Sequence, residues 1–61
     1  MIDLKTLYEQ TTMYCELVVK GINEKYTIET YHQPETPIYV LVYWNNANNT
    51  IKAITFIIKG E

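Results

Sequence analysis

The sequence predicts an α+β fold, with a short N-terminal helix and a mainly antiparallel sheet of three to four strands. Three features predict it: apolar residues at helical spacing near the N-terminus, two segments in which polar and apolar residues alternate, and two runs that are almost entirely apolar. With 61 residues, the chain 1–61 is expected to form a single small domain of marginal stability.

The pattern over residues 2–10 predicts the helix. Asp3 can cap the first turn, and Ile2 can pack on Leu7 as a hydrophobic staple. The apolar side chains of this segment share one face: Leu4, Leu7 and Tyr8. Because so short a helix is unstable alone, we expect it to dock on the rest of the chain.

The first strand is predicted at residues 12–20, where alternate residues are apolar, and Gly21 ends the run. The alternating apolar residues are Met13, Cys15, Leu17 and Val19. The second strand is predicted at about Glu24–His32, with a more apolar face formed by Tyr26, Ile28 and Thr30.

The turn between these strands fixes their register, and two lengths are open. A four-residue loop at residues 21–24 would set Glu16 opposite Glu29, and like charges directly opposed are destabilising. A two-residue turn with Gly21 first would set Glu16 opposite Thr27 instead. We therefore expect the tighter turn.

The second half of the chain predicts a hairpin. Two prolines make residues 33–37 a loop, since proline disrupts both helices and sheet ladders. A third strand is predicted at about Ile38–Trp44, and a fourth at about Thr50–Lys59. The asparagine-rich segment Asn45–Asn49 joins them, because asparagine tolerates the left-handed backbone that such turns need.

The strand at Ile38–Trp44 is apolar on both faces. Ile38, Val40, Val42 and Trp44 alternate with Tyr39, Leu41 and Tyr43. A strand of this kind must be covered on both sides, and a chain this short has little material for a second layer. We expect the cover to be a second copy, which completes the sheet by dimerisation, or another protein. The sequence leaves open whether these strands form a dimer seam or a binding groove.

The composition of the chain excludes some classes of function. The chain is 48% hydrophobic and 20% charged, has no arginine and carries a net charge of −2, so no direct nucleic-acid binding is expected. The N-terminus lacks the pattern of a signal peptide, and no stretch approaches the roughly 20 apolar residues of a membrane span. We therefore expect a cytoplasmic protein without membrane contact.

Cys15 and His32 are the only soft metal ligands, and no paired spacing exists. In the expected register they lie too far apart for a catalytic hydrogen bond. Free cysteine is most often a small core residue. We expect no enzyme activity, no catalytic residues, no metal and no cofactor.

Aromatic residues are concentrated in the central part of the chain. The sequence has six tyrosines and one tryptophan. Tyrosine and tryptophan are enriched at protein interfaces, although they also favour strands for packing reasons alone. We expect a partner-binding patch that includes Trp44, next to the alternative that these residues only pack within a dimer.

From Thr12-Met13 onward, the chain resembles the small dimeric inhibitors of uracil-DNA glycosylase made by some bacteriophages. The similar features are Thr12-Met13 opening a strand, the Gly21 turn, Tyr31-His32 closing the next strand, and a later segment that ends in an aromatic residue and Asn46. The final strand carries Ile51, Ile54 and Phe56 at matching intervals.

The resemblance implies a homodimer that imitates DNA with carboxylates and captures the DNA-probing loop of the enzyme in an apolar groove. Trp44 stands where the family has a functional tyrosine, and Val40 where it has a phenylalanine. Leu41 stands where the family has an acid, and the family forms an acidic helix over residues 38–44, so helix or strand stays open there. The predicted partner-binding residues are Trp44, Tyr43, Val40, Tyr39, Tyr31 and Glu29.

The sequence therefore predicts a non-enzymatic homodimer from a phage or mobile element that binds and inhibits a protein in the host cytoplasm. Uracil-DNA glycosylase is the target that the resemblance implies. The alternative is a structural or self-assembling protein that captures no enzyme.

Overall fold

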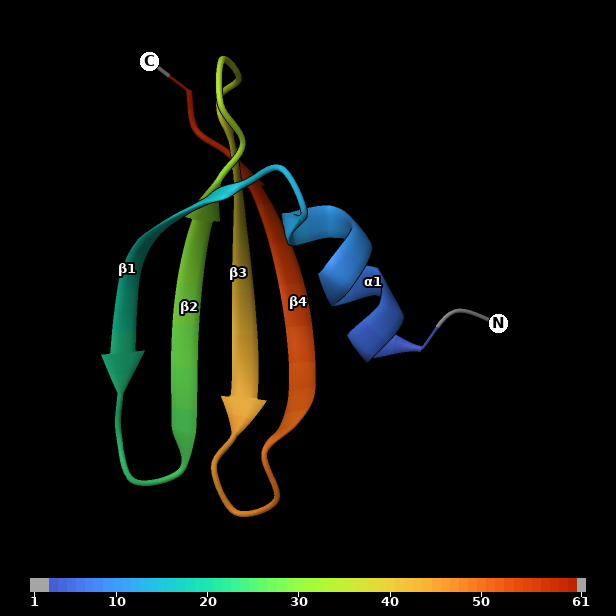
Figure 1. The fold of residues 1–61 in the computed structure, drawn as a ribbon. Helices are drawn as coiled ribbons and strands as arrows, with labels where there is room; N and C mark the ends of the chain where they lie inside the picture. The colour runs from blue at the N-terminus through green and yellow to red at the C-terminus, as the bar shows by residue number, and fades with distance from the viewer. Residues whose placement is uncertain (1–2, 61) are drawn as a thin grey trace.

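A computed structural model describes residues 3–60 and has one helix and a four-stranded antiparallel sheet in that range. The strands follow one another across the sheet in the order β1-β2-β3-β4, so the topology is a simple meander (Figure 1). The predicted α+β fold is confirmed. The elements are α1 Leu4–Thr12, β1 Glu16–Ile22, β2 Tyr26–His32, β3 Ile38–Asn45 and β4 Thr50–Ile58.

Helix α1 begins at the predicted cap. The Asp3 carboxylate accepts a hydrogen bond from the backbone N–H of Thr6 at 2.7 Å, and this bond lowers the pKa of Asp3. The helix ends at Thr12, two residues later than predicted, and the Thr12 hydroxyl donates to the carbonyl of Tyr8 at 2.7 Å. The predicted staple involves Ile2, which lies outside the described residues.

The predicted start of the first strand is wrong. Residues 11 and 12 belong to the last turn of α1, and β1 begins only at Glu16. The connection stays close to the helix, since the N–H of Cys15 donates to the carbonyl of Thr12 and its thiol donates to the carbonyl of Thr11. The alternation at Met13 and Cys15 therefore reflects a helix end and its connection to the sheet, not a strand.

The predicted register of β1 and β2 is also wrong, because neither turn length considered is the observed one. Gly21 lies inside β1, and the turn forms at Asn23, whose side-chain oxygen accepts hydrogen bonds from the N–H groups of Lys25 and Tyr26 at 2.9 and 2.7 Å. This Asx turn sets Lys20 opposite Glu29, so opposite charges face each other. A bulge separates Leu17 from Val19.

The second half follows the prediction. Residues 33–37 form a loop, with Glu35 at a positive φ of 65°. Segment 38–44 is a strand, not the helix that the resemblance would require. The asparagine loop before β4 contains Asn49 at a φ of 56°. A register shift between Tyr43 and Trp44 leaves Lys52 as an extra residue in β4.

The sheet has two unlike faces. Helix α1 lies beside β4 (Figure 1). Its Tyr8 packs edge-on against Tyr31 and Trp44, and this contact defines the side of the sheet that the helix covers. Val40 and Val42, at 1% and 0% exposure, point to this side and are the only fully buried hydrophobic residues among those described. The molecule is 16 Å thick in its shortest direction, as expected for two layers with one face of the sheet left uncovered.

Candidate functional site

The uncovered face of the sheet, called the open face below, is mainly apolar and aromatic. Its members are the residues that alternate with the buried valines, together with their cross-strand partners. None of its hydrophobic members is fully buried. On the three strands β2, β3 and β4 they are Tyr26, Ile28, Thr30, His32, Tyr39, Leu41, Tyr43, Ala53, Thr55 and Ile57.

Two shallow hollows lie on the open face. One, of ≈ 390 Å³, is lined by side chains that include Ile28, Tyr43 and Ala53. The other, of ≈ 260 Å³, lies beside Leu41 and is bordered by Tyr39 and Ile57. Both are bounded mainly by carbon atoms, so the surface suits apolar side chains from another protein.

Among residues 3–60, the charged groups of the open face lie at its edges. Lys52 lies 4.6 Å from the centre of the Tyr26 ring and donates to its hydroxyl at 2.8 Å, which lowers the pKa of Tyr26. Lys59 lies 5.9 Å from the ring of Tyr39. Glu16, opposite His32 in the register, marks the other edge. The two lysines thus border β4, and the acid borders β1.

The helix-covered face holds a polar network around Glu29. One oxygen of its carboxylate accepts hydrogen bonds from the indole N–H of Trp44 and from the hydroxyl of Tyr31, both at 2.9 Å. The hydroxyls of Tyr31 and Tyr8 are 3.1 Å apart, and the Lys20 ammonium lies 4.0 Å from the other carboxylate oxygen. The network joins α1 to three strands, and its polar groups have their hydrogen-bonding or charged partners within it.

Burial raises the pKa of Tyr31 well above its usual range, and its hydrogen bonds to Tyr8 and Glu29 act in the same direction. The stability gained by keeping this tyrosine neutral is present below pH 10, the ordinary value, and is lost as the pH rises above it. We expect Tyr31→Phe to lower the free energy of unfolding by about 1 kcal/mol at neutral pH, because it removes the bond to Glu29.

The variant should also lose less stability than the wild type above pH 10. Denaturant unfolding at neutral pH and above pH 10 measures the loss of stability in each protein. Tyr14→Phe is the matched control, because Tyr14 is 80% exposed. Equal alkaline losses in Tyr31→Phe and the wild type would contradict the assigned role of Tyr31.

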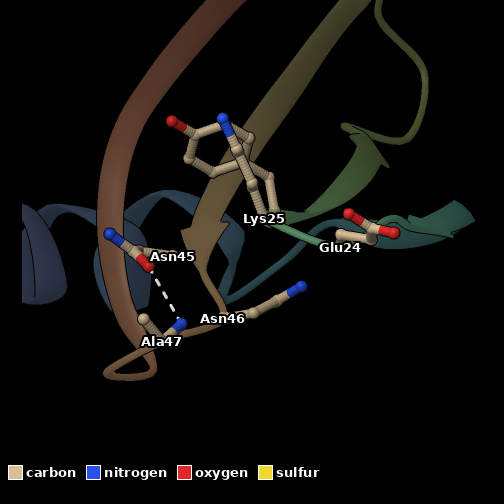
Figure 2. A pocket seen from close by; sticks show the side chains of 6 residues that line it. Glu24, Lys25, Asn45, Asn46 and Ala47 are labelled. Carbon is tan, nitrogen blue, oxygen red and sulfur yellow. Dashed lines mark hydrogen bonds between the residues drawn. The ribbon is translucent and has the colours of Figure 1, made fainter.

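A third hollow, of ≈ 320 Å³, lies between the two hairpin turns (Figure 2). Asn46 joins these turns: its N–H donates to the carbonyl of Lys25 at 3.0 Å and its amide to the carbonyl of Asn23 at 2.8 Å. The side chain of Asn45 accepts from the N–H of Ala47 at 2.9 Å. These polar groups hold the turns in place, so the hollow is a product of turn geometry.

Cys15 and His32 do not form a hydrogen-bonded pair. The predicted separation of the two residues along the hairpin is wrong, since Glu16, next to Cys15, lies opposite His32. The thiol nevertheless donates to Thr11 at 3.3 Å, burial raises its pKa, and the His32 ring bonds the carbonyl of Thr36 at 2.7 Å. Within residues 3–60, no three carboxylate, thiol or imidazole groups gather as metal ligands.

The structure divides the predicted partner-binding residues between the two faces. Glu29, Tyr31 and Trp44 belong to the network under α1, and Val40 is buried at 1% exposure, so it is not available to a partner. Tyr39 and Tyr43 lie on the open face. The six predicted residues therefore do not form one groove, and Val40 is too deeply buried to contact a partner.

Sequence reasoning missed the importance of Leu41 and Ile57 on the open face, and of Tyr8 in the network. The strand alternation grouped Leu41 with Tyr39 and Tyr43 on one face, but Leu41 was not included among the predicted partner-binding residues. Ile57 needed the register of β4, and the contact of Tyr8 with Trp44 needed the position of the helix.

Comparisons with protein-family models, curated proteins and solved structures found no match. The assignment of function therefore depends on the surfaces of this chain. In the part of the chain that the structure describes, no helix has the length and apolar character needed to cross a membrane.

Proposed function

We propose that this protein is a small non-enzymatic binding protein whose open face is a protein–protein interface. The observation that carries the proposal is the contrast between composition and burial. The chain is 48% hydrophobic, yet only Val40 and Val42 are fully buried among the described hydrophobic residues. A continuous apolar face rimmed by charges is typical of an interaction site.

The arrangement of polar groups also favours binding over catalysis. The carboxylate of Glu29 is engaged by Trp44 and Tyr31, and Cys15 and His32 each bond a backbone carbonyl. The open face offers tyrosine rings with polar tips over an apolar surface, which is the composition of interface hot spots.

Inhibition of a host enzyme is the sharper form of this proposal, with uracil-DNA glycosylase as its target. It is supported by the resemblance at Tyr31-His32 and along β4, and by an apolar surface that could receive the side chain of a probing loop. The resemblance at Thr12-Met13 and Gly21 gives no support, because the first pair ends α1 and Gly21 lies inside β1. In this chain the surface would be formed by Leu41, Tyr39 and Tyr43 on a strand. A self-assembling protein without an enzyme target is the second candidate, favoured by the extent of the open face.

The test is an affinity pull-down from bacterial lysate with tagged wild type, Leu41→Lys and Ile58→Lys. Leu41 lies on the open face, whereas Ile58 is 74% exposed on the other side of the sheet. We expect a near-stoichiometric protein to bind the wild type and Ile58→Lys and to be lost with Leu41→Lys. A bound protein that is retained by Leu41→Lys would contradict an interface at the open face.

The enzyme-inhibitor form has its own assay. Purified bacterial uracil-DNA glycosylase should lose activity on a uracil-containing duplex when the wild type is added in stoichiometric amount. Undiminished activity at a large excess would exclude this target and leave the broader binding function untouched.

A further inference from the structure

We propose that the occupant of the open face is a second copy of this chain, packed sheet against sheet about a two-fold axis that runs parallel to the strands. This inference rests on the proposed function, because it takes the open face to be a protein interface. It adds the identity and the orientation of the protein bound there.

The exposed area favours a partner of this size. The chain exposes 4702 Å², whereas about 4100 Å² is expected for a folded monomer of 7.2 kDa. The excess is about 600 Å² per copy. Two copies that hide it would bury about 1,200 Å² in total, the lower end of the range for specific interfaces. One further copy on the open face would therefore bury an area equal to this excess.

The charges on the edges of the open face are complementary to those of a second copy. Glu16, His32, Tyr39 and Ile57 form one row across the four strands, and Lys59 follows at the β4 end of that row. An axis parallel to the strands places the β1 edge of one copy over the β4 edge of the other. Glu16 of each copy then faces Lys59 of its partner.

The same axis accommodates Lys52. At the other end of the open face, Gly21 lies in the row of Ile28 and Tyr43, and a Cβ atom at Gly21 would meet nothing within 4 Å. In a dimer with the parallel axis, Gly21, which has no side chain, lies opposite the region of Lys52 of the partner copy. The ammonium can then reach solvent at the rim.

The other in-plane two-fold axis, perpendicular to the strands, is disfavoured. It would place the β4 edge of one copy over the β4 edge of the other with the strand direction reversed. Lys59 of one copy would then face Lys52 of its partner, and like charges across an interface are costly. The charge pattern therefore selects the parallel axis.

Sedimentation equilibrium over a concentration series tests the association. The wild type should be dimeric at micromolar concentrations, and Leu41→Lys should weaken dimerisation by about a hundredfold, because it places like charges in the seam. Ile58→Lys should dimerise like the wild type. A circular dichroism spectrum of each variant checks that it is folded. A wild type that stays monomeric, or a Leu41→Lys variant that dimerises normally, would overturn the proposal.

A charge exchange tests the orientation. Glu16→Lys and Lys59→Glu should each weaken the dimer by about fivefold to tenfold, and the double variant should recover most of the loss. Within one copy the two residues lie on opposite edges of the sheet, so recovery reports a contact between copies. Failure of the double variant to recover would refute the parallel axis.

The same variants separate this inference from the proposed function. A monomeric wild type that binds a purified target, with binding abolished by Leu41→Lys, would refute the second copy and keep the open face as an interface. A monomeric wild type for which Leu41→Lys changes no binding would refute both.

Discussion

Replacing Trp44 with alanine should lower the free energy of unfolding by about 3 kcal/mol, the lower end of the range for tryptophan since this side chain is partly exposed. The indole packs edge-on against Tyr8 at 5.2 Å between ring centres and donates to Glu29. A domain of 61 residues has a total stability of about 3 to 9 kcal/mol, so the variant should lose between about a third and all of its stability.

Trp44→Phe is the matched control. It keeps an aromatic ring against Tyr8 but removes the N–H that Glu29 accepts, so its loss should be clearly smaller. Denaturant unfolding followed by circular dichroism measures both variants. A Trp44→Ala protein with wild-type stability that no longer binds its partner would restore Trp44 as a binding residue and contradict the structural role given to it here.

Removal of the Glu29 carboxylate is expected to have the next largest effect. Glu29→Ala should cost about 2 kcal/mol, because the indole N–H of Trp44 and the hydroxyl of Tyr31 lose a charged acceptor, and hydrogen bonds to charged groups contribute more than neutral ones. Glu29 is 14% exposed, so water replaces the acceptor only in part.

Glu29→Gln keeps a neutral acceptor at nearly the same place, and its loss should be about half as large. Unfolding of both variants at neutral pH gives the comparison. A double variant with Trp44→Phe should lose less than the sum of the two single losses, because both changes break the same hydrogen bond. Fully additive losses would show that the bond contributes nothing to stability.

The sequence was informative where local chemistry alone decides the structure. Asp3 caps α1 as predicted, the prolines end the ladder after β2, and the asparagines form the turn before β4. Segment 38–44 is a strand, as its content of β-branched and aromatic residues favours. In each case the deciding interaction lies within a few residues of the one that predicts it.

The sequence was misleading where two local interpretations compete. Residues 12–15 alternate like the start of a strand, but the capped helix continues through Thr12, whose hydroxyl donates to the carbonyl of Tyr8. Gly21 suggested a turn, but the Asx turn of Asn23 fixes the hairpin two residues later. The observed register therefore differs from the predicted one, and the residues on β1 have other neighbours on β2 than expected.

The candidate site was predictable only in part. Alternation along β3 correctly separated Val40 and Val42 from Tyr39, Leu41 and Tyr43, and it predicted two apolar faces. Which face the helix covers depends on tertiary packing, which the sequence pattern does not specify. Trp44 and Tyr43 are neighbours in sequence, yet one lies under α1 and the other on the open face.

A second copy and a captured host protein would compete for the open face, because both proposals place their partner there. Each copy keeps a second group of exposed apolar residues away from the seam, on the side of the sheet that carries the helix. Phe56 and Ile58 on β4 and Leu17 on β1 are 53%, 74% and 52% exposed there. These residues lie outside the proposed interface, so Ile58→Lys serves as the control in both the pull-down and the dimerisation assay.

The most direct test of the central claim is an isotope-filtered nuclear Overhauser measurement on a mixture of labelled and unlabelled copies. It detects only contacts between different chains. The account predicts contacts from the methyl groups of Leu41 to Ile28 and Thr30 of the other copy, because the parallel axis lays β3 over β2. Contacts between chains that come only from edge-to-edge pairing of strands or from the helix side, or no such contacts at all, would contradict it.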